Sequence, residues 1–312
     1  MKPKQSVVFF GTGPVAAQSL ELLSKNFIIE AVITKPKPSH HRGTFPVVDI
    51  ALQRSLPLQY VTDKQSVSQL MKQHHFKSKV GVLIDFGIIV GPDVISSFEK
   101  GIVNSHFSLL PEWRGADPIT FSILSGQEKT GVSLMLLVQK MDEGPLLDQS
   151  IVTIANNDTA SSLTRKLITA SDMLLQKTLA SYTQGDVLPE DQTVATLLDQ
   201  KTPTYSSKIA KSDGVIDWSK PASRIEREIR AYLGWPQSKT TLGSVDCIIT
   251  KAHVEKDTSS KRYTPGTFFK SDNCQTLAVG TSQGILVIEE IKPLGKKSMS
   301  IQSFLAGYGS RL

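Results

Sequence analysis

The sequence predicts an α/β protein in which a helix-covered parallel sheet is followed by a smaller domain of short β-strands. Over the first 150 residues, short apolar runs alternate with segments of helical periodicity, a pattern typical of sheets buried on both faces. Residues 206–312 instead hold several short β-rich runs separated by turn-like gaps, which is typical of a barrel or sandwich. With 312 residues, the chain is long enough for both domains.

The elements of the first domain follow from local patterns. Apolar, β-branched runs predict buried strands at 6–11, 27–34, 57–61, 80–86 and 101–107. Helical periodicity predicts helices at 14–26, 47–55, 67–75 and 116–126, the first of them opened by Pro14. Residues 130–138 and 146–154 are joined by a short polar turn and are expected to form an antiparallel pair at the sheet edge. A long helix follows, with Asp158 or Thr159 as its N-cap.

The domain boundaries are predicted from the loss of periodicity after this helix. We expect a first domain at 1–185, a linker at 186–205 that carries two prolines, and a second domain at 206–312. The second domain opens with a charged helix at 222–233. Its short strands are expected at 244–254, 266–270, 276–281 and 284–291.

The net charge of +6 is unevenly distributed. Residues 1–202 hold 19 basic and 19 acidic side chains, whereas residues 203–312 hold 16 basic and 10 acidic ones. A basic domain beside a neutral one is consistent with a polyanionic partner such as nucleic acid, and equally with a solvated basic surface.

Composition predicts a soluble protein of the cytoplasm. Hydrophobic residues make up 39% and charged residues 21%, and no apolar run approaches the roughly 20 residues that span a bilayer. The N-terminal apolar run is too short for a signal peptide. Cys247 and Cys274 match neither a metal site nor a disulfide framework, so no metal is expected.

Two patterns near the N-terminus are weak signals. Gly11 and Gly13 resemble the start of a dinucleotide-binding fingerprint, but Ala16 stands where the third glycine belongs and no acidic residue ends the second strand. A tight strand-to-helix turn is the better interpretation. The sequential pairs His40-His41 and His74-His75 lack zinc-ligand spacing. The first pair lies in a loop where it can meet a substrate, and the second is expected to be an exposed helix end.

Asn104 and His106 form a more informative pattern. Two positions apart on a predicted strand, they project to the same face. Ligands of open parallel sheets bind beyond the carboxyl ends of the strands, so His106 is a candidate acid or base. Asp142 follows another strand of this region, and a carboxylate within reach would fix the imidazole tautomer. Spacing alone leaves open whether the three meet.

These residues also carry a resemblance to a known family. Asn104-x-His106-x-Ser108-Leu109-Leu110-Pro111, the Trp-Arg-Gly of 113–115 and Asp142 resemble the signature of the 10-formyltetrahydrofolate-dependent formyltransferases. Residues 214–238 and 291–305 resemble the C-terminal domain of those members that formylate initiator methionyl-tRNA. The similarity runs essentially end to end.

The resemblance implies a Rossmann-like formyltransferase domain followed by an OB-like β-barrel that supports tRNA binding. It implies catalytic roles for Asn104, His106 and Asp142, and 10-formyltetrahydrofolate as the formyl-donating cosubstrate. Initiator methionyl-tRNA is the implied acceptor, in translation initiation, and we expect a monomer without a membrane partner. The residues expected to bind folate are Ser108, Leu109, Leu110 and Pro111, with the backbone of Phe86, Gly87 and Ile88 at the pterin; those expected to bind tRNA are Arg42, Lys296 and Lys297.

The chain departs from the family at two places. The loop after the second strand, within 34–49, is shorter than usual and keeps Arg42-Gly43 without the lysines that follow them in relatives. We expect Arg42 still to reach the acceptor end of the tRNA, with relaxed discrimination. Phe86 replaces the family's tyrosine, which removes one hydroxyl.

Two alternatives stay open. An N-formyltransferase acting on a sugar-nucleotide amine shares the motif, and the shortened loop slightly favours it. A non-catalytic RNA-binding relative is disfavoured because Asn104, His106 and Asp142 are all present.

Overall fold

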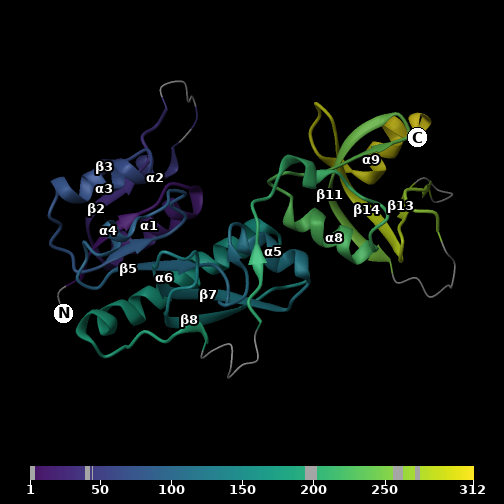
Figure 1. Ribbon diagram of the computed structural model, residues 1–312. Coiled ribbons are helices and arrows are strands. Elements are labelled where there is room, and N and C mark those ends of the chain that lie inside the picture. The colour runs from purple at the N-terminus through teal and green to yellow at the C-terminus, as the bar shows by residue number, and fades with distance from the viewer. Residues whose placement is uncertain (1–3, 39–42, 44, 194–201, 256–262, 271–274) are drawn as a thin grey trace. The chain divides into compact units, whose positions relative to one another are not determined.

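The computed structural model describes residues 4–38, 43, 45–193, 202–255, 263–270 and 275–312. The chain divides into two compact units (Figure 1). The first contains residues up to 118, 129–153 and 164–206. The second contains residues 119–128, 154–163 and 207–312.

The first unit is built on a seven-stranded sheet of order β3-β2-β1-β4-β5-β7-β8. Strands β1 to β5 are parallel, as the alternating pattern predicts, and β7 runs antiparallel to both β5 and β8. The predicted antiparallel edge pair is therefore confirmed. The strands are β1 (Ser6–Phe10), β2 (Ile28–Thr34), β3 (Leu58–Tyr60), β4 (Gly81–Leu83), β5 (Ile102–His106), β7 (Lys129–Leu136) and β8 (Leu146–Thr153).

The helices of the first unit are α1 (Pro14–Asn26), α2 (Pro46–Gln53), α3 (Lys64–Gln73), α4 (Pro92–Ile95) and most of α6 (Ala160–Gln184), whereas α5 (Pro118–Ser125) falls almost wholly in the second unit. Each helix predicted up to residue 185 is present. Helix α3 begins earlier than predicted because the Asp63 side chain caps it by accepting the backbone N–H of Ser66. It ends at Gln73, so His74 and His75 lie exposed just beyond it.

The strand predicted at 80–86 is shorter than expected. Strand β4 ends at Leu83 because Asp85 and Gly87 adopt left-handed backbone angles, with φ of +47° and +63°. The strand pattern cannot reveal this turn, since the side chains on either side of Asp85 are buried. The consequence is functional: strand order reverses between β1 and β4, and ligands of open α/β sheets bind at such a switch point.

Polar contacts fix the opposite end of the sheet. The Glu30 carboxylate on β2 accepts hydrogen bonds from the backbone N–H groups of Lys77 and Ser78 and from the Ser78 hydroxyl. Burial alone would raise the pKa of Glu30, but these hydrogen bonds hold it below the ordinary glutamate value. The ionised carboxylate thus ties β2 to the segment that leads into β4.

The second unit has an antiparallel sheet of order β10-β11-β14-β13-β12, with β15 paired to β14. The sheet curls into a half-barrel consistent with an OB-like fold, and apolar residues of α8 and α9 complete its core. Its elements are the 3-10 turn Lys211–Gly214, α8 (Ala222–Ala231), β10 (Ser238–Leu242), β11 (Val245–Glu255), β12 (Phe268–Lys270), β13 (Leu277–Gly280), β14 (Ile285–Pro293), β15 (Met299–Ser300), α9 (Ile301–Tyr308) and the 3-10 turn Gly309–Arg311.

Candidate active site

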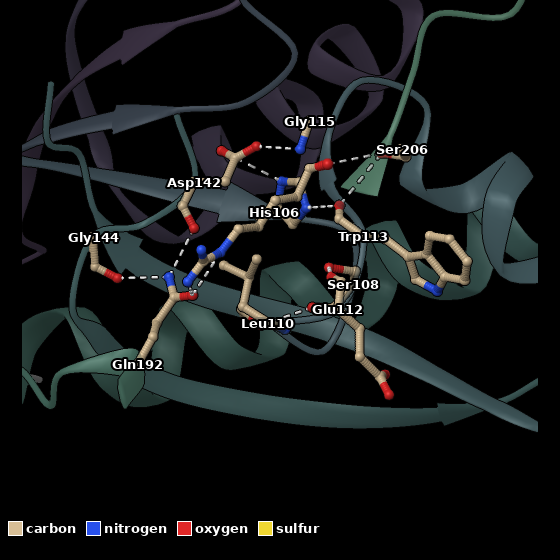
Figure 2. Close-up of polar contacts among 12 residues, drawn as sticks. His106, Ser108, Leu110, Glu112, Trp113, Gly115, Asp142, Gly144, Gln192 and Ser206 are labelled. Atoms are coloured by element: carbon tan, nitrogen blue, oxygen red, sulfur yellow. Dashed lines mark hydrogen bonds and ion pairs between the residues drawn. The ribbon is translucent and has the colours of Figure 1, made fainter. Parts of the chain in front are cut away.

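The structure brings the three predicted catalytic side chains into one region. Asn104 and His106 lie on β5 and are 8% and 7% exposed. Asp142 lies in the turn that follows β7, and its Oδ1 is 3.8 Å from Nδ1 of His106 (Figure 2). An amide, an imidazole and a carboxylate are therefore gathered at the carboxyl end of a central strand.

The loop after β5 fixes the orientation of the imidazole. Nε2 of His106 lies 2.9 Å from the backbone carbonyl of Trp113. A carbonyl oxygen only accepts hydrogen bonds, so Nε2 carries a proton and donates it. Nδ1, which faces Asp142, is then the ring nitrogen that can exchange a proton.

Asp142 is constrained by a backbone hydrogen bond to its carboxylate and by the conformation of its own turn. Its Oδ2 accepts the backbone N–H of Gly115 at 2.7 Å. Its own backbone is left-handed, with φ of +55°, a conformation that costs about 1–3 kcal/mol for a residue with a side chain. Gly144 follows closely, and a Cβ there would collide with the carbonyl oxygen of Leu136. The turn is thus a tightly constrained one, and its constraint aims the carboxylate at His106.

The predicted linker contributes to this site. Nε2 of Gln192 donates to the carbonyl oxygens of Asp142 and Gly144, at 2.8 Å each (Figure 2). The Thr204 hydroxyl accepts the N–H of Trp113 at 2.9 Å. Two short strands, β6 (Arg114–Gly115) and β9 (Tyr205–Ser206), pair in parallel alongside it. Neither Gln192 nor Thr204 carries a sequence signal, because the segment has no periodicity and its contacts are distant in the chain.

The stretch 108–111, which follows β5 in the chain, is buried and held in place by hydrogen bonds. The Ser108 hydroxyl is fully buried and donates to the carbonyl of Glu112. Ser133 donates to the carbonyl of Ser108 and accepts the N–H of Leu110, whose side chain packs in a small apolar cluster. In this arrangement the Ser108 hydroxyl stabilises the loop, and the stretch forms a rigid wall rather than a set of free polar groups.

The segment Phe86–Ile88 presents backbone at the switch point between β1 and β4. The Phe86 ring is buried in the core, whereas Gly87 is exposed. The Thr12 hydroxyl donates to the carbonyl of Phe86 at 2.7 Å, and the Lys35 ammonium donates to that of Gly87 at 3.3 Å. These two hydrogen bonds fix the loop with its peptide groups at the sheet edge.

Asp85 occupies the N-terminal end of α1, where the pyrophosphate of a dinucleotide binds in proteins that carry the full glycine fingerprint. Its carboxylate accepts the backbone N–H groups of Ala16 and Val15 at the start of α1, and a Cβ on Gly13 would collide with it. Desolvation by the surrounding atoms raises the pKa of Asp85 to about 6 although part of the residue reaches solvent, and the charge of Asp117 adds to the rise. The Gly11-Gly13 turn is therefore the generic tight turn that the sequence favours.

The predicted tRNA contacts lie elsewhere or outside the described residues. Lys296 and Lys297 are exposed in the turn between β14 and β15 of the second unit. Arg42, His40 and His41 fall outside the residues that the structure describes, as does Cys274. In the described part of the chain, no three His, Cys, Asp or Glu side chains are grouped so as to hold a metal ion. No helix of that part is long and apolar enough to cross a membrane.

An acid–base group at the carboxyl edge of a parallel sheet defines an α/β enzyme. Comparison with known proteins specifies its kind. Residues 4–179 match the family model described as formyl transferase, and residues 208–309 match that of the formyl transferase C-terminal domain. The chain belongs to the formyl transferase family, whose members use 10-formyltetrahydrofolate as the formyl donor.

Relatives of similar length share both domains. The chain is 35% identical over 310 residues to the methionyl-tRNA formyltransferase of Roseiflexus castenholzii, covering 96% of this chain and 95% of the relative. It is 31% identical over 311 residues to that of Coxiella burnetii, with 98% and 96% covered. Among solved structures, an N-formyltransferase from Helicobacter canadensis, in complex with folinic acid and dTDP-3-aminofucose, shares the fold with a TM-score of 0.67 at 20% identity, covering 93% of this chain and all of that one.

Proposed function

We propose that this protein transfers the formyl group of 10-formyltetrahydrofolate to the amino group of initiator methionyl-tRNA, giving N-formylmethionyl-tRNA for translation initiation. The observation that carries the proposal is the similarity to methionyl-tRNA formyltransferases over both units, the second unit included. Residues 203–312, which make up most of that unit, hold the whole basic excess of the chain, which is consistent with a polyanionic substrate such as tRNA. The protein acts as a monomer in the cytoplasm.

Asn104 and His106 are placed to stabilise charge on the formyl oxygen. As the amine attacks the formyl carbon, a carbon–nitrogen bond forms and negative charge builds on that oxygen. Asn104 is 8% exposed and lies two positions before His106 on β5, so its amide N–H groups are placed to donate to that oxygen from a largely buried position. One such buried donor is worth about 10²–10³ in rate.

The proton route runs through Nδ1 of His106 and Asp142. Because Nε2 is engaged by the Trp113 carbonyl, Nδ1 is the nitrogen that donates to the developing oxyanion. The Asp142 carboxylate stabilises the charged imidazole and accepts the proton of the attacking ammonium, directly or through a water. The bond from the formyl carbon to the folate nitrogen then breaks, and that nitrogen takes up the proton that Asp142 had accepted, which restores the carboxylate. No covalent enzyme intermediate is needed.

The folate binds between two rigid backbone segments. Peptide groups of Phe86, Gly87 and Ile88 hold the pterin ring, and residues 108–111 form the opposite wall. Thr12 and Lys35 keep the first segment in place, and Ser133 supports the second. Both walls are set before the substrate arrives, so little entropy is lost in ordering them.

The tRNA is held by basic side chains outside the catalytic group. Lys296 and Lys297 are two exposed cations in one turn of the second unit, suited to phosphates as point charges. Arg42 is assigned to the acceptor end on the family resemblance. A substrate held by phosphate contacts binds less tightly as salt rises.

One assay tests this function against its rivals. Purified protein and 10-formyltetrahydrofolate are incubated with either initiator methionyl-tRNA or a nucleotide-linked aminosugar, and N-formyl product is quantified. We expect transfer to the tRNA, with a KM that rises steeply with salt. Transfer to the aminosugar alone would replace the proposal by the sugar-nucleotide alternative, and transfer to neither would leave an RNA-binding relative.

A further inference from the structure

The side chain of Gln192 links the two loops that flank His106. It is 1% exposed, and its amide nitrogen donates to the carbonyl oxygens of Asp142 and Gly144. Its oxygen accepts two hydrogen bonds from the guanidinium of Arg114, from Nε at 3.2 Å and Nη2 at 2.7 Å. Both polar ends of the amide are therefore engaged, one on each loop.

The segment that carries Gln192 is itself anchored. The backbone N–H of Leu146 donates to the carbonyl of Glu190 at 2.7 Å, and the reciprocal hydrogen bond is 2.8 Å long. Arg114 also lies 3.8 Å from the Glu143 carboxylate. The amide is thus fixed from its own backbone as well as from its partners.

The Asp142 turn needs such an anchor. The left-handed backbone of Asp142 is strained, and a strained turn relaxes unless neighbouring contacts hold it. The two carbonyls that Gln192 binds belong to the peptide groups directly after Asp142 and after Gly144. Their position sets the direction in which the carboxylate points.

We propose that Gln192 is a positioning residue for Asp142. It does not touch the reacting atoms. By binding the two carbonyls it fixes the distance between the Asp142 carboxylate and Nδ1 of His106, and it couples this turn to the Arg114 loop. The inference rests on formyl transfer as the proposed chemistry but not on the identity of the amine acceptor.

A double-mutant cycle between Gln192→Ala and Asp142→Asn tests this role. Single-turnover formyl transfer is measured with whichever acceptor the wild-type protein formylates. We expect Gln192→Ala to slow transfer on the order of 10- to 100-fold, as misplacement of a catalytic group by about 1 Å does, with the KM values for both substrates nearly unchanged. In the Asp142→Asn background, Gln192→Ala should slow transfer no more than about twofold, because coupled residues are not additive. The adjacent exposed Thr193→Ala is the matched control and keeps wild-type rates.

One further variant and one further readout keep the test decisive. If Gln192→Ala fails to fold, Gln192→Glu replaces it as the test variant. It keeps the length of the side chain but loses the two N–H donors, so it should slow transfer by about the same 10- to 100-fold. The imidazole resonances of His106, recorded by NMR without substrate, should change in the same sense in Gln192→Ala and Asp142→Asn. Multiplicative rate losses, a loss confined to KM, or unchanged resonances in a folded variant would overturn the positioning role. A wild-type protein that formylates no amine would refute the proposed function instead, and the resonances would still decide the role of Gln192.

Discussion

The charge of Asp142 makes an electrostatic contribution to formyl transfer whose size follows from its distance to His106. Its Oδ1 lies 3.8 Å from Nδ1 of His106, and both side chains are largely buried. At an effective dielectric constant of about 20, two opposite unit charges at this distance attract each other by about 4 kcal/mol, an upper bound because burying both groups costs desolvation free energy. Because each 1.4 kcal/mol or so changes a rate tenfold, full loss of the pair corresponds to at most about 10³ in rate.

Asp142→Asn removes this charge and little else. The asparagine oxygen can still accept the N–H of Gly115, so the turn is preserved. We expect kcat for formyl transfer to fall about 10²- to 10³-fold, with an unchanged unfolding midpoint. Transfer is followed with 10-formyltetrahydrofolate carrying a radiolabelled formyl group and initiator methionyl-tRNA as acceptor.

The neighbouring carboxylate supplies the control. Glu143→Gln removes a charge one residue away, whose ion pairs are with Arg114 at 3.8 Å and Lys140 at 3.7 Å. It should keep kcat within about threefold of wild type, since a half-exposed ion pair contributes little. If Asp142→Asn kept kcat within the same range, the assignment of Asp142 to proton transfer would be wrong.

Three further predictions address the turn, the fold and the tRNA. Gly115→Ala should lower the unfolding midpoint and kcat together, because φ is +107° and a Cβ would collide with the carbonyl oxygen of Ser206; the strain alone is about 1–3 kcal/mol. Glu30→Gln should lower the free energy of unfolding at pH 7 by about 1–3 kcal/mol, measured by urea denaturation. This loss should shrink as the pH falls through the lowered pKa of Glu30, where the wild-type carboxylate takes up its proton and its contribution disappears. Replacing Lys296 and Lys297 by alanine should raise the KM for tRNA and reduce the salt slope of binding by roughly one for each phosphate that is no longer neutralised.

Each of these has an outcome that contradicts it. Gly101→Ala is the control for the turn: φ is +67° but a Cβ there meets no atom within 4 Å, so stability falls while kcat does not. Equal effects of the two glycine variants on kcat would mean that Gly115 does not help to position Asp142. A pH-independent loss in Glu30→Gln would mean that its charge is not what stabilises β2. An unchanged salt slope would place the tRNA elsewhere.

The sequence by itself determined the layers of the fold and nominated Asn104, His106 and Asp142 as candidate catalytic residues. Alternation of apolar strands and helices is a local pattern, and it predicted the parallel sheet, the antiparallel edge and the second β-rich domain. Period-two spacing placed Asn104 and His106 on one face because side chains alternate along any strand. The early end of β4 escaped this logic, since a left-handed residue such as Asp85 leaves no trace in hydrophobic periodicity.

Only the tertiary structure decided what surrounds the imidazole. The carboxylate that meets His106, the carbonyl that fixes its tautomer and the amide that holds the turn come from three separate segments. Gln192 and Asp142 are 50 positions apart, and Gly115 and Asp142 are 27 apart. Contacts between such distant residues depend on how the strands are ordered and how the loops pack, and no local pattern encodes either. For that physical reason, the sequence predicted the candidate groups, and only the folded chain set the distances between them.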